Sequence, residues 1–262
     1  MKTKTVANDV EIAYLDSGAG EAVCLVHGFC GSSAYWQKIL PQLEKSHRVI
    51  APDLRGHGNS SVPSESFTVE KMAGDLAHLL DQTGIEKITL LGHSLGGYVA
   101  LAFAELFPER VKAIGLIHST AYPDDEQAKA NRTKGMDNIQ RNGVEPFIKA
   151  LIPKLFAPES ATLIPAEWNL AREIGLQTPA EGAIRTLEAM RDRPDRREIL
   201  ASLPCPLLLV AGKNDQIIAP EKTFTVKGPR VHQVLLEGAG HMGMLETPDE
   251  LAQEMLSFLS KI

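Results

Sequence analysis

The sequence predicts an α/β protein whose mostly parallel sheet is covered by helices on both faces. Apolar runs without polar alternation recur along the chain, as in strands that are buried on both faces. Amphipathic stretches separate these runs, so that strand and helix alternate. The 262 residues, 44% hydrophobic and 23% charged, have an ordinary globular composition, so the chain is large enough to bury a core without covalent or metal staples.

Eight strands are expected. Residues 3–7 and 10–15 lie on either side of Asn8 and Asp9, a two-residue hairpin signal, and predict an antiparallel edge. The six continuous apolar runs are residues 23–26, 49–51, 88–91, 113–117, 207–211 and 231–236. The amphipathic stretches that predict covering helices are residues 33–43, 69–83, 97–107 and 248–262.

One segment, residues 121–203, interrupts this alternation. It contains helical stretches and no strong strand, the main ones being residues 125–141, 144–152, 167–175 and 179–191. Thr178, Pro179 and Glu181 predict a capped start for the last of these, with the proline at the first helical position. Ligands of open α/β sheets bind on the side where this insertion emerges, so we expect a helical lid. The predicted organisation is a core of residues 1–120 and 204–262 and a lid of residues 121–203.

A serine stands where one strand turns directly into a helix. The sequence Gly-His-Ser-Leu-Gly at 92–96 follows the apolar run 88–91 and precedes the helical run 98–106. This is the nucleophile elbow pattern in its required context. Its glycines allow backbone conformations and close approaches that a Cβ would obstruct. Ser94 is therefore the predicted nucleophile.

A serine hydroxyl needs a base, and the base needs a group that orients it and stabilises its charge. Asp215 follows the strand at 207–211 and His241 follows the strand at 231–236, so both stand at strand ends with Ser94. The order Ser94, Asp215, His241 agrees with the serine, acid, histidine order of elbow-containing enzymes. Asp53 is interpreted as a structural hydrogen-bonding residue. The strand-end or loop histidines interpreted in the same way are His27, His57, His93 and His118.

Acyl transfer also needs donors for a tetrahedral oxyanion. The loop at 27–31 follows the strand at 23–26, where one backbone donor is expected, and the other is the residue after the serine. Phe29 and Leu95 are the predicted oxyanion amides. The Phe29 ring is expected to line the acyl pocket.

Together these motifs resemble the α/β-hydrolase superfamily, in its serine-nucleophile, carboxylesterase-like branch with a helical lid. The resemblance extends over essentially the whole chain and is carried by residues 27–29, 53–60, 92–97, Asp215 and 240–241. It implies the α/β-hydrolase fold and a hydrolytic activity. Within the superfamily, Ser94 in place of aspartate disfavours dehalogenase and epoxide hydrolase chemistry. Tyr98 in place of arginine disfavours the menaquinone-pathway lyase, and Phe29 in place of tryptophan disfavours cofactor-free haloperoxidases.

The substrate pocket is expected near the elbow and under the lid. Cys30 lies beside the proposed site and is expected to be reachable by thiol reagents. Arginines of the lid, Arg132 among them, are candidates for binding a substrate carboxylate, although charge runs usually form solvated faces. The predicted pocket residues are His27, Gly28, Cys30, His93, Phe147, Leu151, Trp168 and Met242.

Composition excludes several other functions. The net charge is −6 and no basic cluster stands out, so neither nucleic-acid binding nor membrane anchoring is expected. No apolar stretch follows the N-terminal lysines, which predicts a cytoplasmic protein. Three cysteines without C-x-x-C spacing, and histidines without an H-E-x-x-H pattern, predict no disulfide framework, no metal and no cofactor.

The leading hypothesis is a serine carboxylesterase that acts on small to medium uncharged esters through an acyl-enzyme. The expected partner is thus a small-molecule ester. A carbon–carbon bond hydrolase or lactonase with the same triad, and a ligand-binding signalling module of the same fold, remain alternatives.

Overall fold

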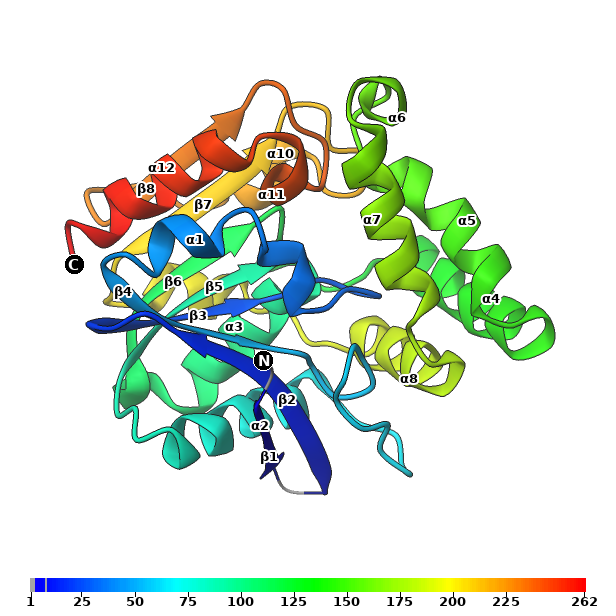
Figure 1. Ribbon diagram of the computed structural model, residues 1–262, viewed down its shortest axis with the longest axis horizontal. Helices are drawn as coiled ribbons and strands as arrows, with labels where there is room; N and C mark the ends of the chain where they lie inside the picture. The colour runs from blue at the N-terminus through cyan, green and yellow to red at the C-terminus, as the bar shows by residue number, and fades with distance from the viewer. Residues whose placement is uncertain (1–2, 8) are drawn as a thin grey trace.

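The computed structural model describes residues 3–7 and 9–262 and contains a single eight-stranded sheet within them (Figure 1). The strand order is β1-β2-β4-β3-β5-β6-β7-β8. β1 pairs antiparallel with β2, β2 pairs antiparallel with β4, and the remaining neighbours are parallel. The strands are β1 (Thr3–Ala7), β2 (Val10–Ser17), β3 (Glu21–Val26), β4 (His47–Pro52), β5 (Ile88–His93), β6 (Val111–Ile117), β7 (Leu207–Gly212) and β8 (Val231–Leu236).

The predicted fold class is confirmed, including the eight strands and the antiparallel edge. Ala7 pairs with Val10, so the chain reverses at the expected hairpin, although Asn8 lies outside the described residues. Strands β5 and β7 are buried along their whole length, which explains why their sequences show no polar alternation.

Helices cover both faces of the sheet. Figure 1 shows α1 (Leu40–Leu43) and α12 (Pro248–Leu259) on one face and α2 (Val69–Gln82) and α3 (Leu95–Leu106) on the other. The Thr68 side chain caps α2 by accepting from the Lys71 amide, whereas α3 is buried over most of its length. The short helices of the core are η1 (Ser33–Trp36), η2 (Pro108–Arg110), α10 (Pro220–Thr223) and α11 (Gly243–Glu246).

The direction of strand order reverses at β3. The chain passes from β3 to β4 on one side and then returns to β5 on the other, so β3 and β5 are neighbours in the sheet. Their carboxyl ends therefore meet where open α/β sheets bind ligands. The loop containing Phe29 follows β3, and Ser94 follows β5.

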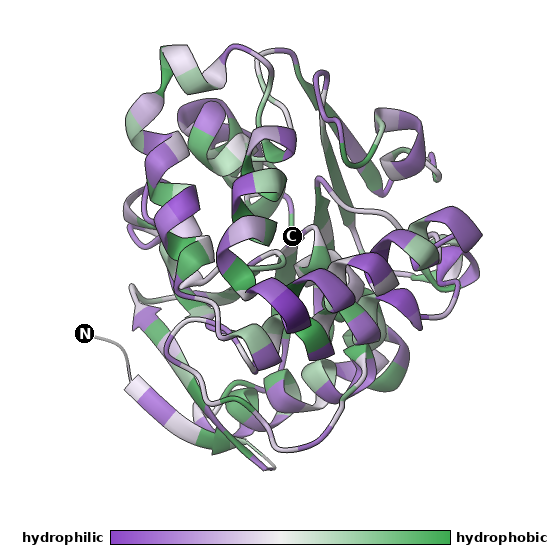
Figure 2. Ribbon diagram, turned by 90° about the vertical axis from the view of Figure 1, so that its right-hand side faces the viewer, coloured by the Kyte–Doolittle hydropathy of each residue, from purple (hydrophilic) through white to green (hydrophobic). Residues whose placement is uncertain are grey.

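Between β6 and β7 the chain is helical and contains no strand; every residue from 121 to 203 is described. Figure 1 shows α4 to α8 beside the sheet, and Figure 2, which views them face-on, shows hydrophilic and hydrophobic segments alternating along them. The helices are α4 (Glu126–Asn142), α5 (Val144–Leu155), α6 (Ser160–Leu163), α7 (Pro165–Leu176), α8 (Ala180–Arg191) and α9 (Arg197–Ser202). The domain boundaries and the role of these helices as a lid stay predictions.

The predicted capping of α8 is wrong. The helix begins at Ala180, with Pro179 at the N-cap position and no side-chain cap bond. Thr178 instead continues the turn that ends α7, because its amide donates to the Gly175 carbonyl and its side chain is buried.

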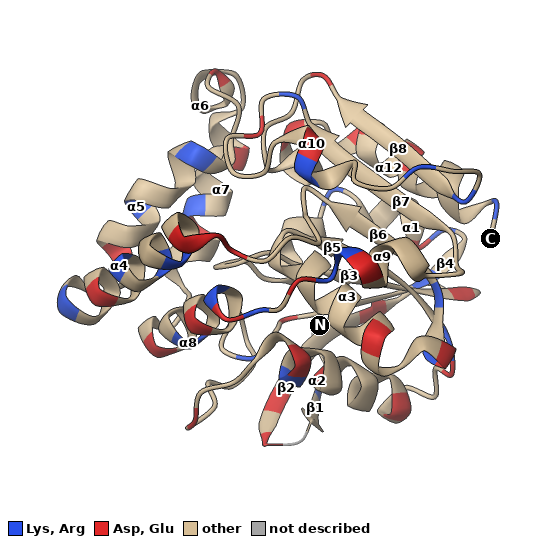
Figure 3. Ribbon diagram, turned by 180° about the vertical axis from the view of Figure 1, so that it is seen from behind, with Lys and Arg blue, Asp and Glu red and all other residues tan. Residues whose placement is uncertain are grey.

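No helix in the described part of the chain is both long and apolar enough to cross a membrane. Figure 3 shows acidic and basic residues intermixed along the outer helices, α4, α5 and α8 among them.

Candidate active site

Ser94 occupies a strained turn between β5 and α3. Its φ of 50° lies in the left-handed region, a backbone conformation that residues other than glycine rarely adopt. A Cβ on Gly92 would come within 2.2 Å of the Gly96 carbonyl oxygen, and one on Gly96 would come within 2.2 Å of the Val26 carbonyl oxygen. Both glycines are thus required by close backbone approach, as the sequence pattern predicted. Ser94 is held by its amide, which donates to the Ile117 carbonyl.

Two other residues share this unusual backbone. Among the described non-glycine residues, positive φ occurs at Cys30, Ser94 and His118. These follow β3, β5 and β6, which are adjacent in the sheet. Strained backbone persists where the surrounding structure fixes it, and it clusters at functional sites. The strain therefore marks the carboxyl edge of the central strands as the candidate site.

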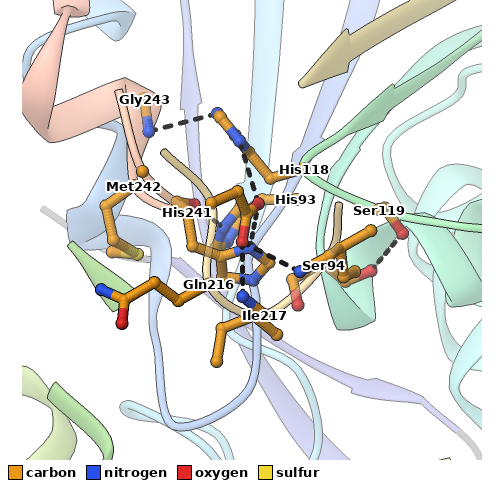
Figure 4. A network of polar contacts seen from close by, with 12 residues as sticks. His93, Ser94, His118, Ser119, Gln216, Ile217, His241, Met242 and Gly243 are labelled. Atoms are coloured by element: carbon orange, nitrogen blue, oxygen red, sulfur yellow. Dashed lines mark hydrogen bonds and ion pairs between the residues drawn. The ribbon is translucent and has the colours of Figure 1, made fainter. Parts of the chain in front are cut away.

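The loops after β7 and β8 bring an acid and an imidazole together at this edge (Figure 4). Nδ1 of His241 lies 2.7 Å from Oδ2 of Asp215, and both side chains are buried. Because the ionised carboxylate only accepts, Nδ1 carries the proton and Nε2 is left as the basic nitrogen. The other Asp215 oxygen accepts from the amides of Ile217 and Ile218 at 2.8 and 2.9 Å. This orients the imidazole, as a general base requires.

His118 is a neighbour of Asp215 that the sequence did not reveal. The Gly243 amide donates to its Nε2, so the proton of the neutral ring is on Nδ1, which lies 3.5 Å from Oδ2 of Asp215. Burial lowers the pKa of His118 despite the nearby carboxylate. Burial alone would raise the pKa of Asp215, but its contacts with His241 and His118 hold that pKa well below its usual value. Asp215 is therefore an anion across the physiological range.

The His93 side chain supports the backbone of the His241 loop. Its Nε2 donates to the His241 carbonyl oxygen at 2.8 Å. Burial, together with the neighbouring His241 and His118, lowers the pKa of His93 well below its usual value. His93 is therefore neutral, and it fixes the backbone from which the His241 ring projects.

The amides of Phe29 and Leu95 are available as donors. Neither donates a hydrogen bond to any group in the described part of the protein. Leu95 is the first residue of α3, where amides have no partner within the helix. The loop of Phe29 is held by His27, whose Nδ1 donates to the Gly28 carbonyl and whose Nε2 accepts from the Leu54 amide.

A cavity of about 100 Å³ lies beside Ser94, His241 and Phe29. It is smaller than the pockets of roughly 300–1,000 Å³ that enclose drug-sized ligands, so it suits a small substrate. It is lined by Ser94, His241, Phe29, Tyr35, His93, Tyr98, Arg132, Leu151, Leu155, Met190, Ile217 and Met242.

The cavity includes only part of the pocket predicted from sequence. His93, Leu151 and Met242 line it, as does Phe29. The remaining predicted pocket residues, His27, Gly28, Cys30, Phe147 and Trp168, are not among its lining residues. Buried His27 supports the loop instead, a Cβ on Gly28 would crowd Ser94 and His93, and the Phe147 ring packs edge-on against Phe29.

The expectation that thiol reagents reach Cys30 is wrong. Cys30 is 1% exposed, and burial strongly raises the pKa of its thiol. The backbone turn at this position directs the side chain into the core rather than into the cavity.

Glu246 joins the His241 loop to the inserted helices. Its Oε2 accepts from the amides of Gly240 and Met242, and its Oε1 accepts from the Ala157 amide and the Ser160 hydroxyl. The His241 amide also donates to the Leu155 carbonyl, in the same turn. The position of the imidazole thus depends on the connection between α5 and α6. A carboxylate close after the glycine-rich turn was the only sequence signal for this.

His118, Asp215 and His241 together could offer three metal ligands, because one atom of each lies within 4.8 Å of the others. However, Nε2 of His118 accepts from Gly243, and Nδ1 of His241 is bonded to Asp215. One ring nitrogen of each histidine thus already takes part in a hydrogen bond within the protein. The absence of a metal stays a prediction.

A family model described as the alpha/beta hydrolase fold matches residues 21–248. The chain belongs to the α/β-hydrolase family. It is therefore a hydrolase by family, and its eight-stranded sheet is the sheet of this fold.

Similar α/β-hydrolases include an esterase, a lipase and a dienoic acid hydrolase. A thermophilic esterase from Thermogutta terrifontis, in a malate-bound structure, is 34% identical with a TM-score of 0.95, covering 100% of this chain and 98% of that one. Lipase 1 of Psychrobacter immobilis is 30% identical over 99% of this chain and 84% of its own length. A 2-hydroxy-6-oxo-6-(2'-aminophenyl)hexa-2,4-dienoic acid hydrolase of Metapseudomonas resinovorans is 26% identical over 97% of this chain and 89% of its own length.

Proposed function

We propose that this α/β-hydrolase is a carboxylesterase acting on small esters, with Ser94, His241 and Asp215 as its catalytic triad. The observation that carries the proposal is the shared cavity of Ser94 and His241, with the His241 ring bonded to a buried Asp215. The similarity to an esterase over the full chain supports it.

In the proposed reaction, Oγ of Ser94 attacks the ester carbonyl while His241 accepts the hydroxyl proton. The amides of Phe29 and Leu95 stabilise the oxyanion. The carbon–oxygen bond of the ester then breaks, and His241 gives its proton to the departing alcohol. Water attacks the acyl-enzyme with His241 as base, which releases the acid and restores Ser94.

Hydrolysis of p-nitrophenyl acetate, butyrate and octanoate by wild type and Ser94→Ala tests this function. We expect turnover on the short esters and a loss of at least about 10⁴-fold in kcat for Ser94→Ala, as when a triad nucleophile is removed. A phosphonate inhibitor should attach to Ser94, as mass spectrometry would detect. Persistent turnover in Ser94→Ala would refute the assignment.

A carbon–carbon bond hydrolase is the second candidate, favoured by the similarity to the Metapseudomonas enzyme. It would use the same three residues, so the substrate distinguishes the two. Phosphonate labelling of Ser94 without turnover of any ester, followed by cleavage of a 2-hydroxy-6-oxo-diene acid, would favour this reading. Labelling without either activity would instead favour a ligand-binding role.

A further inference from the structure

Apart from its reacting groups, the candidate cavity has one charged side chain among the described residues of its lining, the guanidinium of Arg132. Arg132, on α4, lines the cavity together with Ser94 and His241. Aromatic and aliphatic side chains make up most of the remaining wall, and no carboxylate lines it in the described chain. An anionic group in this cavity would therefore meet a cation and no lining acid.

The charge of Arg132 is not fully neutralised by Asp124, the carboxylate to which it is bonded. Nε of Arg132 donates to one Asp124 oxygen at 2.9 Å, and Nη1 of Arg193 donates to the other at 2.6 Å. Burial alone would raise the pKa of Asp124, but the two arginines lower it, so this carboxylate is ionised. Two guanidinium groups then share one carboxylate, and the cluster has a net charge of +1.

The arrangement also leaves donors on the cavity-lining arginine. The Nη groups of Arg132 make no hydrogen bond to the described residues, whereas Arg193 is buried and donates to the Met190 and Tyr122 carbonyls. Arg193 also stacks over Tyr98, another residue of the cavity wall, at 4.0 Å from its ring centroid. Arg193 and Asp124 thus form a fixed support for Arg132. The two Nη groups of Arg132 keep N–H donors that a ligand could use, and together they form a planar fork. Such a fork matches a carboxylate in geometry and charge.

We infer that the substrate of this site carries a carboxylate, which Arg132 binds while Ser94 faces the ester bond. This inference rests on the proposed function and narrows its substrates from small esters in general to anionic ones. It replaces the uncharged esters that were expected from the sequence. The cavity volume of about 100 Å³ limits the spacer between carboxylate and ester to a few carbons. Monoesters of short dicarboxylic acids and acyl esters of short hydroxy acids both meet this description.

Two pairs of esters test the inference. Monomethyl glutarate and methyl pentanoate differ in charge on the acyl side, and 4-acetoxybutanoate and butyl acetate differ in charge on the alcohol side. Acid release is measured by pH-stat titration for wild type, Arg132→Gln, Arg132→Lys and Arg141→Gln. Arg193 still pairs with Asp124 in the Arg132 variants, and the exposed Arg141, also on α4, is the matched control.

In wild type, kcat/KM should be higher for the anionic member of at least one pair, and that pair identifies the side of the ester that bears the carboxylate. Arg132→Gln should lower the ratio of anionic to neutral kcat/KM by about tenfold to a hundredfold, the usual effect of losing a charged hydrogen bond. Arg132→Lys should retain part of the ratio and Arg141→Gln all of it. A ratio that changes less than twofold in Arg132→Gln, or no anionic preference in wild type, overturns the inference.

Failure of the proposed function gives a different result. If wild type hydrolyses none of the four esters, calorimetric titration with glutarate still measures whether the site binds a carboxylate. Glutarate that binds wild type but not Arg132→Gln would support the inference without esterase activity. Equal binding or no binding would overturn it.

Discussion

At the scale of single residues, the site depends on side chains whose direction is set by strained backbone. Ser94 and His118 have left-handed φ angles of 50° and 47°. Motif order predicted that Ser94, Asp215 and His241 lie together. The structure places Ser94 and His241 in one cavity and Asp215 against His241, while their catalytic roles stay proposals. The approach of His118 to Asp215 was not predictable, because a histidine at a strand end has no signal that distinguishes a partner of the acid from a core residue. The inward rotation of Cys30 was missed for a similar reason, since its backbone conformation is not encoded in a recognisable motif.

The Phe29 side chain and backbone are expected to have separate effects. The ring lines the cavity, whereas the amide is the proposed oxyanion donor. Phe29→Ala removes only the ring, so we expect kcat on p-nitrophenyl acetate to fall less than about tenfold and the preference to move toward longer acyl chains. Steady-state kinetics over acyl chains of two to eight carbons measures this. A folded variant, verified by circular dichroism, that loses more than about a hundredfold would contradict the backbone role, since that is the usual cost of removing an oxyanion donor.

At the scale of elements, the inserted helices were found by their periodicity, but their inward faces were not. Sequence located α4, α5, α7 and α8 to within a few residues, and it missed the short α6 and α9, which have too few turns to show a period. Which side chains reach the cavity depends on how each helix is rotated against the sheet. Leu151 of α5 reaches it, whereas Trp168 of α7 does not. Tyr98 was within reach of sequence reasoning, because it lies one helical turn after Ser94.

Glu246 makes the connection between these helices and the His241 loop testable. All four of its bonds are accepted from donors, so the amide nitrogen of Glu246→Gln would face donors in two of them. We expect the free energy of unfolding to fall by about 1–3 kcal/mol and kcat to fall with it, because the imidazole loses its support. Urea denaturation and ester kinetics measure the two effects.

Glu254→Gln is the control for this substitution. Glu254 pairs with His232 on the partly exposed surface of α12, away from the cavity. Its loss should change stability by less than about 1 kcal/mol, as for other exposed pairs. Equal effects of the two substitutions would show that Glu246 has no special role in the site.

At the scale of the whole molecule, buried neutral histidines link folding to pH. His57 is buried, its Nδ1 donates to the Arg55 carbonyl, and its Nε2 has no partner within the described structure. Burial and the neighbouring His27 lower the pKa of His57 to about 3, from 6.5 in an unfolded chain. Burial also lowers the pKa values of His93 and His118. The folded protein thus resists protonation that the unfolded chain accepts.

The sign of the resulting pH effect follows from proton binding. Between pH 6.5 and about 3 the unfolded chain holds a proton on residue 57 that the folded state lacks, so acidification favours unfolding. The stability is fully present above pH 6.5 and falls by up to about 1.4 kcal/mol per pH unit for this histidine. In His57→Asn, whose amide can still donate to the Arg55 carbonyl, the plot of unfolding free energy against pH should be shallower by about that amount. Urea denaturation of both proteins from pH 7.5 to 4 measures the difference, and parallel plots would mean that His57 has the same pKa in the folded protein as in the unfolded chain.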